Sequence, residues 1–98
     1  MYEYEVLYVS KLPFIKHEIL IFPSGIATHN HPHSHVTVES VNQAVGDRKI
    51  VSRKFIQSRL SEGEIITRAH ALARVRKYRV NYNCEDYVAE LLGRDPKI

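Results

Sequence analysis

The sequence has no tryptophan and only one cysteine, Cys84, in 98 residues. A single cysteine excludes an intrachain disulfide, and it suits either a reducing compartment or a thiol kept for chemistry. No apolar run comes near the about 20 residues that span a bilayer, and no charged segment leads into an apolar run as in a secretory signal. We therefore expect one soluble domain over residues 1–98, located in the cytoplasm.

The charge of the chain is only moderately positive. Its net charge is +3, and the excess of basic residues lies between Arg48 and Arg79. A solvated basic face is the expected structure here, with peripheral contact to anionic lipid headgroups as the alternative. No basic motif with the interleaved aromatic residues typical of nucleic-acid binding is apparent, so no nucleic-acid partner is expected.

The N-terminal third of the chain predicts an antiparallel arrangement of strands. Residues 2–9 alternate and are rich in β-forming side chains, Pro13 indicates a loop, and residues 17–22 form a second predicted strand. Residues 23–25, Pro-Ser-Gly, are typical of a tight turn, because proline presets the turn and glycine takes the left-handed conformation that closes it. Residues 26–30 then return as the partner strand.

This hairpin predicts which side chains meet. A loop of three residues pairs Phe22 with Ile26 and, further along, Ile19 with His29. Side chains directly opposite each other lie on the same face, so His29 falls on the side of Ile19 and has His17 as its diagonal neighbour. A loop of two residues would separate the two histidines.

The segment 83–88 predicts the start of a helix. Asn83 is a good N-cap, the two acidic residues after the cysteine suit the positive end of the helix dipole, and Cys84 falls at about the first helical position. We expect a thiolate there to be stabilised, which would lower the pKa of the thiol. The alternative is a small buried cysteine on the apolar stripe that it shares with Val88.

The remaining patterns complete a prediction of an α+β fold, with an antiparallel sheet packed against helices. Ser61 and Glu64 form a capping box that begins a helix. The other expectations are a short turn or helix over 36–45 ending at Gly46, a strand over 49–55, a helix from 62 to about Val75 that buries Ile65, Ala69 and Leu72, and a brief strand over 78–80.

Four alternating histidines follow the hairpin, at positions 29, 31, 33 and 35. Such a tract can bind a metal, but Pro32 interrupts the strand, and no second cysteine or acidic cluster completes a site. We expect an exposed polar loop for His31, His33 and His35, with no bound metal or cofactor.

Three residues can act together as a nucleophilic site. A thiol at a helix N-terminus needs a base, and the base needs an orienting partner. Cys84 is the candidate nucleophile, His17 the candidate base and His29 the orienting group, while the first N–H groups of the helix can stabilise an oxyanion. The alternative is that His17 is an ordinary strand histidine.

The same residues resemble the lecithin retinol acyltransferase family, which includes phospholipase/acyltransferases. The resemblance is carried by His17, by His29 twelve residues later and by the Asn-Cys-Glu-x-aromatic-Val segment at 83–88, and it covers about residues 10–93. It implies a circularly permuted papain-like fold and acyl transfer through a thioester, with Cys84 as nucleophile, His17 as base and His29 as the third polar residue. The animal enzymes of this family carry a C-terminal hydrophobic anchor that has no counterpart here, so we expect at most peripheral membrane contact.

Three functions remain open at this point. The first is a thiol-dependent acyltransferase or lipase-like hydrolase acting on an acyl ester or a lipid. The second is a cysteine peptidase or amidase of the same superfamily. The third is a catalytically silent interaction module. The shape of the cleft would separate the first two, because acyl chains need a long, apolar cleft and peptides a polar, open one.

Overall fold

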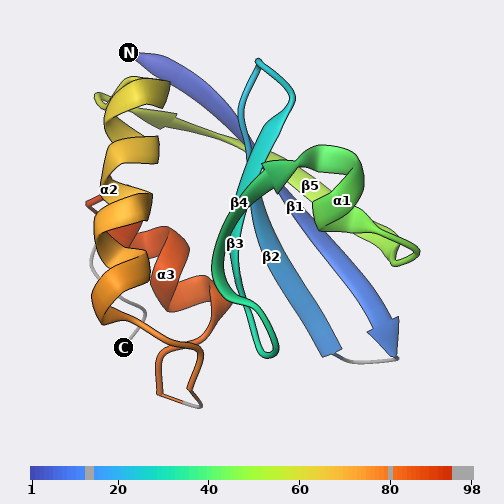
Figure 1. The fold of residues 1–98 in the computed structure, drawn as a ribbon. Coiled ribbons are helices and arrows are strands. Elements are labelled where there is room, and N and C mark those ends of the chain that lie inside the picture. The colour runs from blue at the N-terminus through green and yellow to red at the C-terminus, as the bar shows by residue number, and fades with distance from the viewer. Residues whose placement is uncertain (13–14, 80, 94–98) are drawn as a thin grey trace.

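The computed structural model describes residues 1–12, 15–79 and 81–93. It confirms an α+β fold: five antiparallel strands form one sheet in the order β4-β3-β2-β1-β5, with helices on both of its faces (Figure 1). The elements are β1 (Tyr2–Leu12), β2 (Ile15–Ile21), β3 (Ile26–His31), β4 (His35–Ser40), α1 (Val41–Val45), β5 (Lys49–Ser58), α2 (Glu62–Val75) and α3 (Cys84–Leu91).

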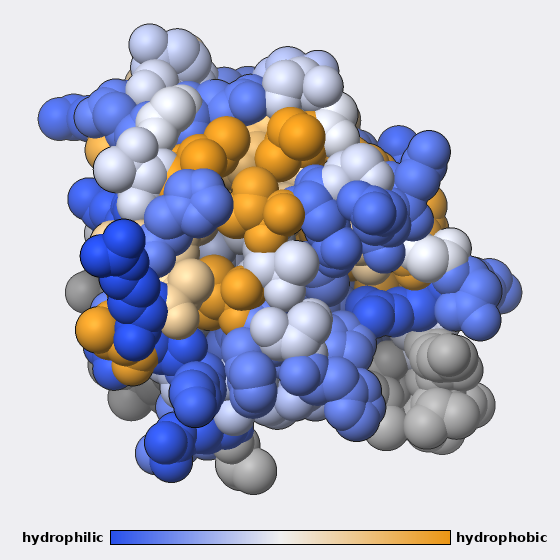
Figure 2. Space-filling view, viewed as in Figure 1, coloured by the Kyte–Doolittle hydropathy of each residue, from blue (hydrophilic) through white to orange (hydrophobic). Residues whose placement is uncertain are grey.

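Alternation along the strands divides the apolar side chains between two faces. One face, covered by α2 and α3, carries the larger cluster, in which Leu20 of β2 and Phe22, the residue that follows β2, pack with Tyr87 of α3. The opposite face is covered by α1, and there Ile19 and Ile21 pack with Leu7, Val9, Ala27 and Ala44. In the view of Figure 2, apolar side chains are visible between α2 and β4, with polar residues around them.

The predicted hairpin register is confirmed. Ile21 pairs with Ala27 and Leu20 with Thr28 across β2 and β3. The turn is closed by the N–H of Gly25, which donates to the carbonyl of Phe22 at 3.0 Å. Gly25 has a φ of +91°, a conformation that glycine adopts without the steric cost of a Cβ atom.

The prediction for residues 36–45 is wrong in its first half. Residues 35–40 form β4, which pairs along its whole length with β3, from His31↔His35 to Ile26↔Ser40. Three consecutive β-branched residues at 36–38 favour a strand, and only the short α1 follows, ending at Gly46 as predicted. The strands β1 and β5 also run three residues past their predicted ends, and of the expected strand at 78–80 only the bridge Arg79↔Tyr82 forms. Pro13 and Val80 lie outside the described residues.

The capping box of α2 is present in both directions. The Ser61 hydroxyl accepts from the N–H of Glu64 at 3.2 Å, and the Glu64 carboxylate accepts from the N–H of Ser61 at 3.0 Å. The helix buries Ile65 and Ala69 as predicted, while Leu72 is half-buried. None of the helices in the described ranges combines the length and the apolar content needed to cross a bilayer.

Ser61→Ala removes one side of this capping box. We expect it to lower the free energy of unfolding by about 1 kcal/mol, which in a domain of this size lowers Tm by roughly 4–8 °C. Thermal unfolding followed by circular dichroism measures the change. Ser61→Asp keeps an acceptor at the cap and is the matched control, so an equal loss in both variants would contradict the assignment.

Candidate active site

Cys84 is the first residue of α3, as predicted. The Asn83 side chain caps the helix, because its Oδ1 accepts from the N–H groups of Glu85 at 3.0 Å and Asp86 at 3.2 Å. The Asp86 carboxylate in turn accepts from the N–H of Asn83 at 3.1 Å. The N–H of Cys84 itself belongs to the first turn, which has no intrahelical acceptor. The cap therefore fixes the cysteine at the helix end with its own N–H still available.

The thiol lies where β2 and β3 separate. The N–H of Phe22 donates to Ile26 of β3, and N–H groups of alternate residues in a strand point toward the same neighbour, so the N–H of Glu18 also points to the β3 side. The register between these strands covers only residues 20–21 and 27–28. Beyond it, the Glu18 N–H donates instead to the Cys84 sulfur at 3.4 Å. The sulfur thus occupies the opening between two strands, next to the peptide bond that joins His17 to Glu18.

His17 and His29 are in direct contact, which confirms the argument from the hairpin register. Nε2 of His17 lies 2.6 Å from Nδ1 of His29, and Nε2 of His29 lies 2.6 Å from a carboxylate oxygen of Glu39. The His29 side chain is only 2% exposed. Residues of β2, β3 and β4 therefore form one continuous polar chain across three neighbouring strands.

The polar chain of His17, His29 and Glu39 determines which ring nitrogens carry protons. A carboxylate only accepts, so Nε2 of His29 donates to Glu39, and the neutral His29 ring then has an acceptor at Nδ1. Nε2 of His17 donates to that acceptor, which leaves Nδ1 of His17 with a free lone pair. A histidine whose other nitrogen is held in this way is oriented as a proton acceptor.

The structure does not join Cys84 to either histidine by a hydrogen bond. The His17 ring lies on the α1 side of the sheet, with the rings of His29 and His31 at centroid distances of 4.9 and 5.5 Å. The sulfur approaches from the α3 side and reaches the level of the strand backbone. Proton transfer between Cys84 and His17 therefore requires the imidazole to turn about its side-chain bonds toward the opening between β2 and β3.

The predicted direction of the thiol pKa is wrong. Burial raises the pKa of Cys84, and the nearby carboxylates of Glu18 and Glu85 act in the same direction. The N–H of Glu18 opposes this effect through its hydrogen bond to the sulfur. Cys84 is only 7% exposed, so the cost of burying a charged thiolate is larger than the stabilisation that the helix N-terminus gives it.

We therefore expect Cys84 to alkylate slowly at neutral pH. Because the folded pKa lies above that of a free thiol, the thiolate fraction, and with it the rate, should rise through a midpoint above about 8.5. The rate of iodoacetamide labelling between pH 6 and 10, followed by intact mass, measures this midpoint. The urea-unfolded chain is the control, and a folded midpoint below its value would contradict the effect of burial.

Burial also keeps the histidines neutral. It lowers the pKa of His17 to about 3, and electrostatic repulsion of a protonated ring by His29, Arg48 and His31 lowers it further. The pKa of His29 is lowered mainly by burial, while the hydrogen bond to Glu39 acts in the opposite direction. At neutral pH the site thus holds a neutral thiol and a neutral imidazole rather than an ion pair.

The rest of the histidine tract does not form one cluster. His31 joins His17 and His29, while the N–H of Tyr78 donates to Nδ1 of His35 at 3.1 Å. Within the described part of the chain, no group of three or more His, Cys, Asp and Glu residues is arranged to hold a metal ion. His31 is half-buried and His33 exposed, so only part of the tract is the exposed loop that we predicted.

A small cavity opens beside the thiol. Its volume is about 230 Å³, and it is lined by Tyr8, Lys16, Glu18, Ser52, Cys84 and Glu85. Lys16, Glu18 and Glu85 carry charges and Ser52 carries a hydroxyl group, so most of the residues that line this small cavity are polar.

Sequence reasoning missed two side chains of this site, Glu39 and Arg48, and one backbone donor, the N–H of Glu18. Glu39 lies two residues beyond Thr37, which pairs with His29, so alternation would have placed it on the histidine side once β4 was identified. No sequence signal was available for Arg48 or for the Glu18 N–H, because both depend on how distant segments pack.

The fold and site together define a small α+β protein with a buried, capped thiol beside a histidine–carboxylate chain. Comparisons with protein-family profiles, with curated proteins and with solved structures gave no match.

Proposed function

We propose that this protein is a thiol-dependent acyltransferase or hydrolase that works through a thioester on Cys84. His17 is the base, His29 orients it, and Glu39 holds His29. The observation that carries the proposal is the hydrogen bond from the Glu18 N–H to the Cys84 sulfur, because it fixes the sulfur at the peptide next to the base and brings an N–H donor to the reacting atom.

The chemistry then uses groups already described. Once the His17 imidazole has turned toward the opening between β2 and β3, the sulfur attacks the carbonyl carbon of an acyl donor, and the thiol proton passes to Nδ1 of His17. The N–H of Cys84, in the first turn of α3, can donate to the carbonyl oxygen as it gains charge. Collapse of the tetrahedral intermediate breaks the bond to the leaving group, which takes the proton from His17, and leaves a thioester. Water or another acceptor, deprotonated by His17, releases the acyl group and restores the thiol.

A circularly permuted papain-like arrangement fits this proposal. Such a site needs a cysteine at a helix N-terminus packed on a sheet that supplies the histidine, with the histidine strand before the cysteine helix in the chain. Here α3 packs on β2 and β3, and β2 carries His17.

The cavity favours a short or polar acyl group. With a volume of about 230 Å³ and side chains such as Lys16, Glu18 and Glu85 around it, it suits polar groups better than a long alkyl chain, which would leave these charges without solvent. The amide or peptide substrate of a cysteine peptidase or amidase is therefore a better match to this cavity than a phospholipid.

One observation favours the silent interaction module as a second candidate. The raised pKa of Cys84 and the lowered pKa of His17 both oppose a thiolate–imidazolium pair. A protein that had lost catalysis would tolerate such a neutral pair, whereas an enzyme must transfer the proton during the attack itself.

Intact-mass spectrometry tests the proposal. The protein is incubated at neutral pH with p-nitrophenyl acetate, with a short amino-acyl ester and with phosphatidylcholine. A single acyl adduct that forms and then hydrolyses supports covalent catalysis, and a faster reaction with the amino-acyl ester supports the polar substrate. If no donor gives an adduct, the interaction module replaces the enzyme.

A further inference from the structure

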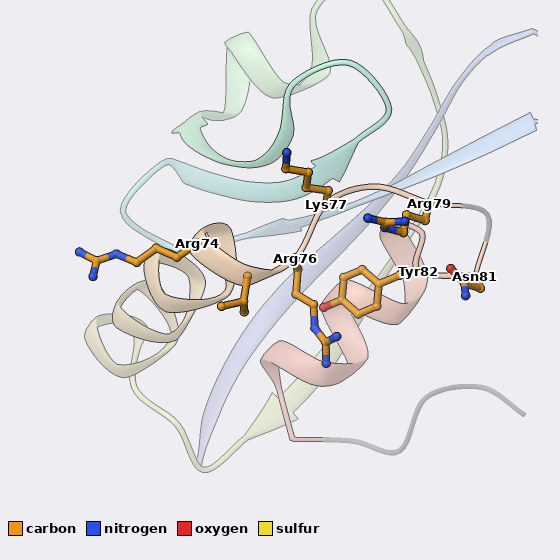
Figure 3. Close-up of a pocket in the computed structure, with 7 residues that line it drawn as sticks. Arg74, Arg76, Lys77, Arg79, Asn81 and Tyr82 are labelled. Atoms are coloured by element: carbon orange, nitrogen blue, oxygen red, sulfur yellow. The ribbon is translucent and has the colours of Figure 1, made fainter.

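A second cavity lies apart from the thiol, where α2 ends and the chain runs toward α3. It has a volume of about 380 Å³ and shares no lining residue with the cavity beside Cys84. Its polar lining residues are Arg74, Arg76, Lys77, Arg79, Asn81 and Tyr82 (Figure 3).

This cavity carries positive charge that the surrounding protein leaves largely uncompensated. Its lining holds four basic side chains and no carboxylate. One of them, Arg76, is neutralised by Glu90, whose two oxygens lie 3.2 and 3.1 Å from its nitrogens. No ion pair between described residues engages Arg74, Lys77 or Arg79.

The paired arginine builds a fixed wall for the cavity. The Arg76 guanidinium lies over the Tyr82 ring at 4.9 Å from its centroid, and the Tyr82 hydroxyl hydrogen-bonds to the same Glu90. Around this wall the side chains of Lys77, Arg79 and Asn81 are exposed, so they can turn toward a ligand. Arg74 extends away from the other labelled residues (Figure 3) and belongs to the rim.

This chemistry selects an anion with several oxygens and more than one charge. Guanidinium and ammonium donors match phosphate oxygens, and a phosphate monoester carries close to two negative charges at neutral pH. A carboxylate would leave most of the positive charge uncompensated. A long polyanion is disfavoured, because the first turn of the adjacent helix α3 carries Glu85 and Asp86, which repel a phosphate backbone that runs past the cavity.

We propose that this cavity binds the phosphate group of a small phosphate monoester. The site is independent of the proposed chemistry at Cys84, and its test reads binding rather than activity. Glycerol 3-phosphate and phenyl phosphate are the probes, titrated into the folded protein while amide signals are followed by NMR.

We expect saturable binding, with signal changes concentrated at residues 74–82 and affinity that falls as salt is added. Lys77→Gln together with Arg79→Gln should weaken binding about tenfold or more. Lys49→Gln with Arg59→Gln removes the same charge from exposed sites elsewhere and should leave the affinity within about twofold.

Several results would overturn the proposal. Equal loss in both double variants, or equal binding of sulfate with signal changes spread over the surface, would mean general attraction of anions. Binding of anionic vesicles or of an RNA oligonucleotide, without binding of either monoester, would assign the basic residues to a lipid surface or a polymer. Retained binding in Lys77→Gln/Arg79→Gln would exclude this cavity.

Discussion

Cys84→Ser should abolish the acyl adduct and lower the rate of ester turnover by about a thousandfold or more. Serine keeps the size of the side chain and the hydrogen bond from the Glu18 N–H, but its hydroxyl loses a proton far less readily than a thiol. The base next to it is weakened by burial, because the pKa of His17 is lowered to about 3. A weak base cannot compensate for a weaker nucleophile, so the effect should be large.

The loss must come from chemistry and not from unfolding. Cys84 is 7% exposed, and replacing it by a residue of similar volume should cost less than about 1.5 kcal/mol of stability. Near-ultraviolet circular dichroism and Tm of the variant provide the control. An adduct of the same mass that persists in Cys84→Ser, mapped by peptide digestion to another side chain, would contradict the assignment of the nucleophile.

The parts of the site that sequence could predict are those that depend on local chemistry. The turn at 23–25 sets the hairpin parity, and parity alone brings His17 to His29. The helix start at Cys84 follows in the same way from the capping side chain of Asn83. Both inferences need only a few neighbouring residues, and both are confirmed.

What could not be predicted depends on contacts between distant segments. The pKa of Cys84 is set by burial against β2, 66 residues earlier in the chain, and a local argument from the helix dipole gave the wrong direction. Glu39 was missed because residues 35–40 were not identified as a strand, and only the pairing of β4 with β3 brings its carboxylate to His29. Position along the chain therefore carries no information about the pKa of Cys84, and it locates Glu39 only once β4 is known.

The histidine–carboxylate chain makes the second large prediction. His17→Ala should lower the rate of Cys84 acylation by about a hundredfold to ten-thousandfold, the usual contribution of a general base. Because the pKa of His17 is lowered to about 3, the imidazole stays unprotonated as the pH falls from 7 toward 4. The acylation rate of the unmodified protein should therefore show no loss near pH 6.5, where an ordinary histidine would gain its proton.

Glu39→Gln tests the polar chain rather than the base itself. The amide can donate to Nε2 of His29, which moves the proton of that ring to Nδ1. His29 then donates to Nε2 of His17, so that the lone pair of His17 is engaged by His29 and its proton lies on Nδ1. Nδ1 of His17 could then no longer accept the proton of the Cys84 thiol. We expect acylation to slow by about tenfold or more, while binding of the ester changes little. Glu3→Gln, at an exposed position of β1, is the matched control for the lost carboxylate.

The ranking of the variants decides between the two proposed functions. An enzyme that uses this chain should lose most with His17→Ala, less with Glu39→Gln and nothing with Glu3→Gln. If His17→Ala and Glu39→Gln lower Tm but leave the rate of acylation per folded molecule unchanged, the chain of His17, His29 and Glu39 has a structural role. In that case a slow reaction at Cys84 would be no more than that of a buried thiol, and the interaction module would be the better description of the protein.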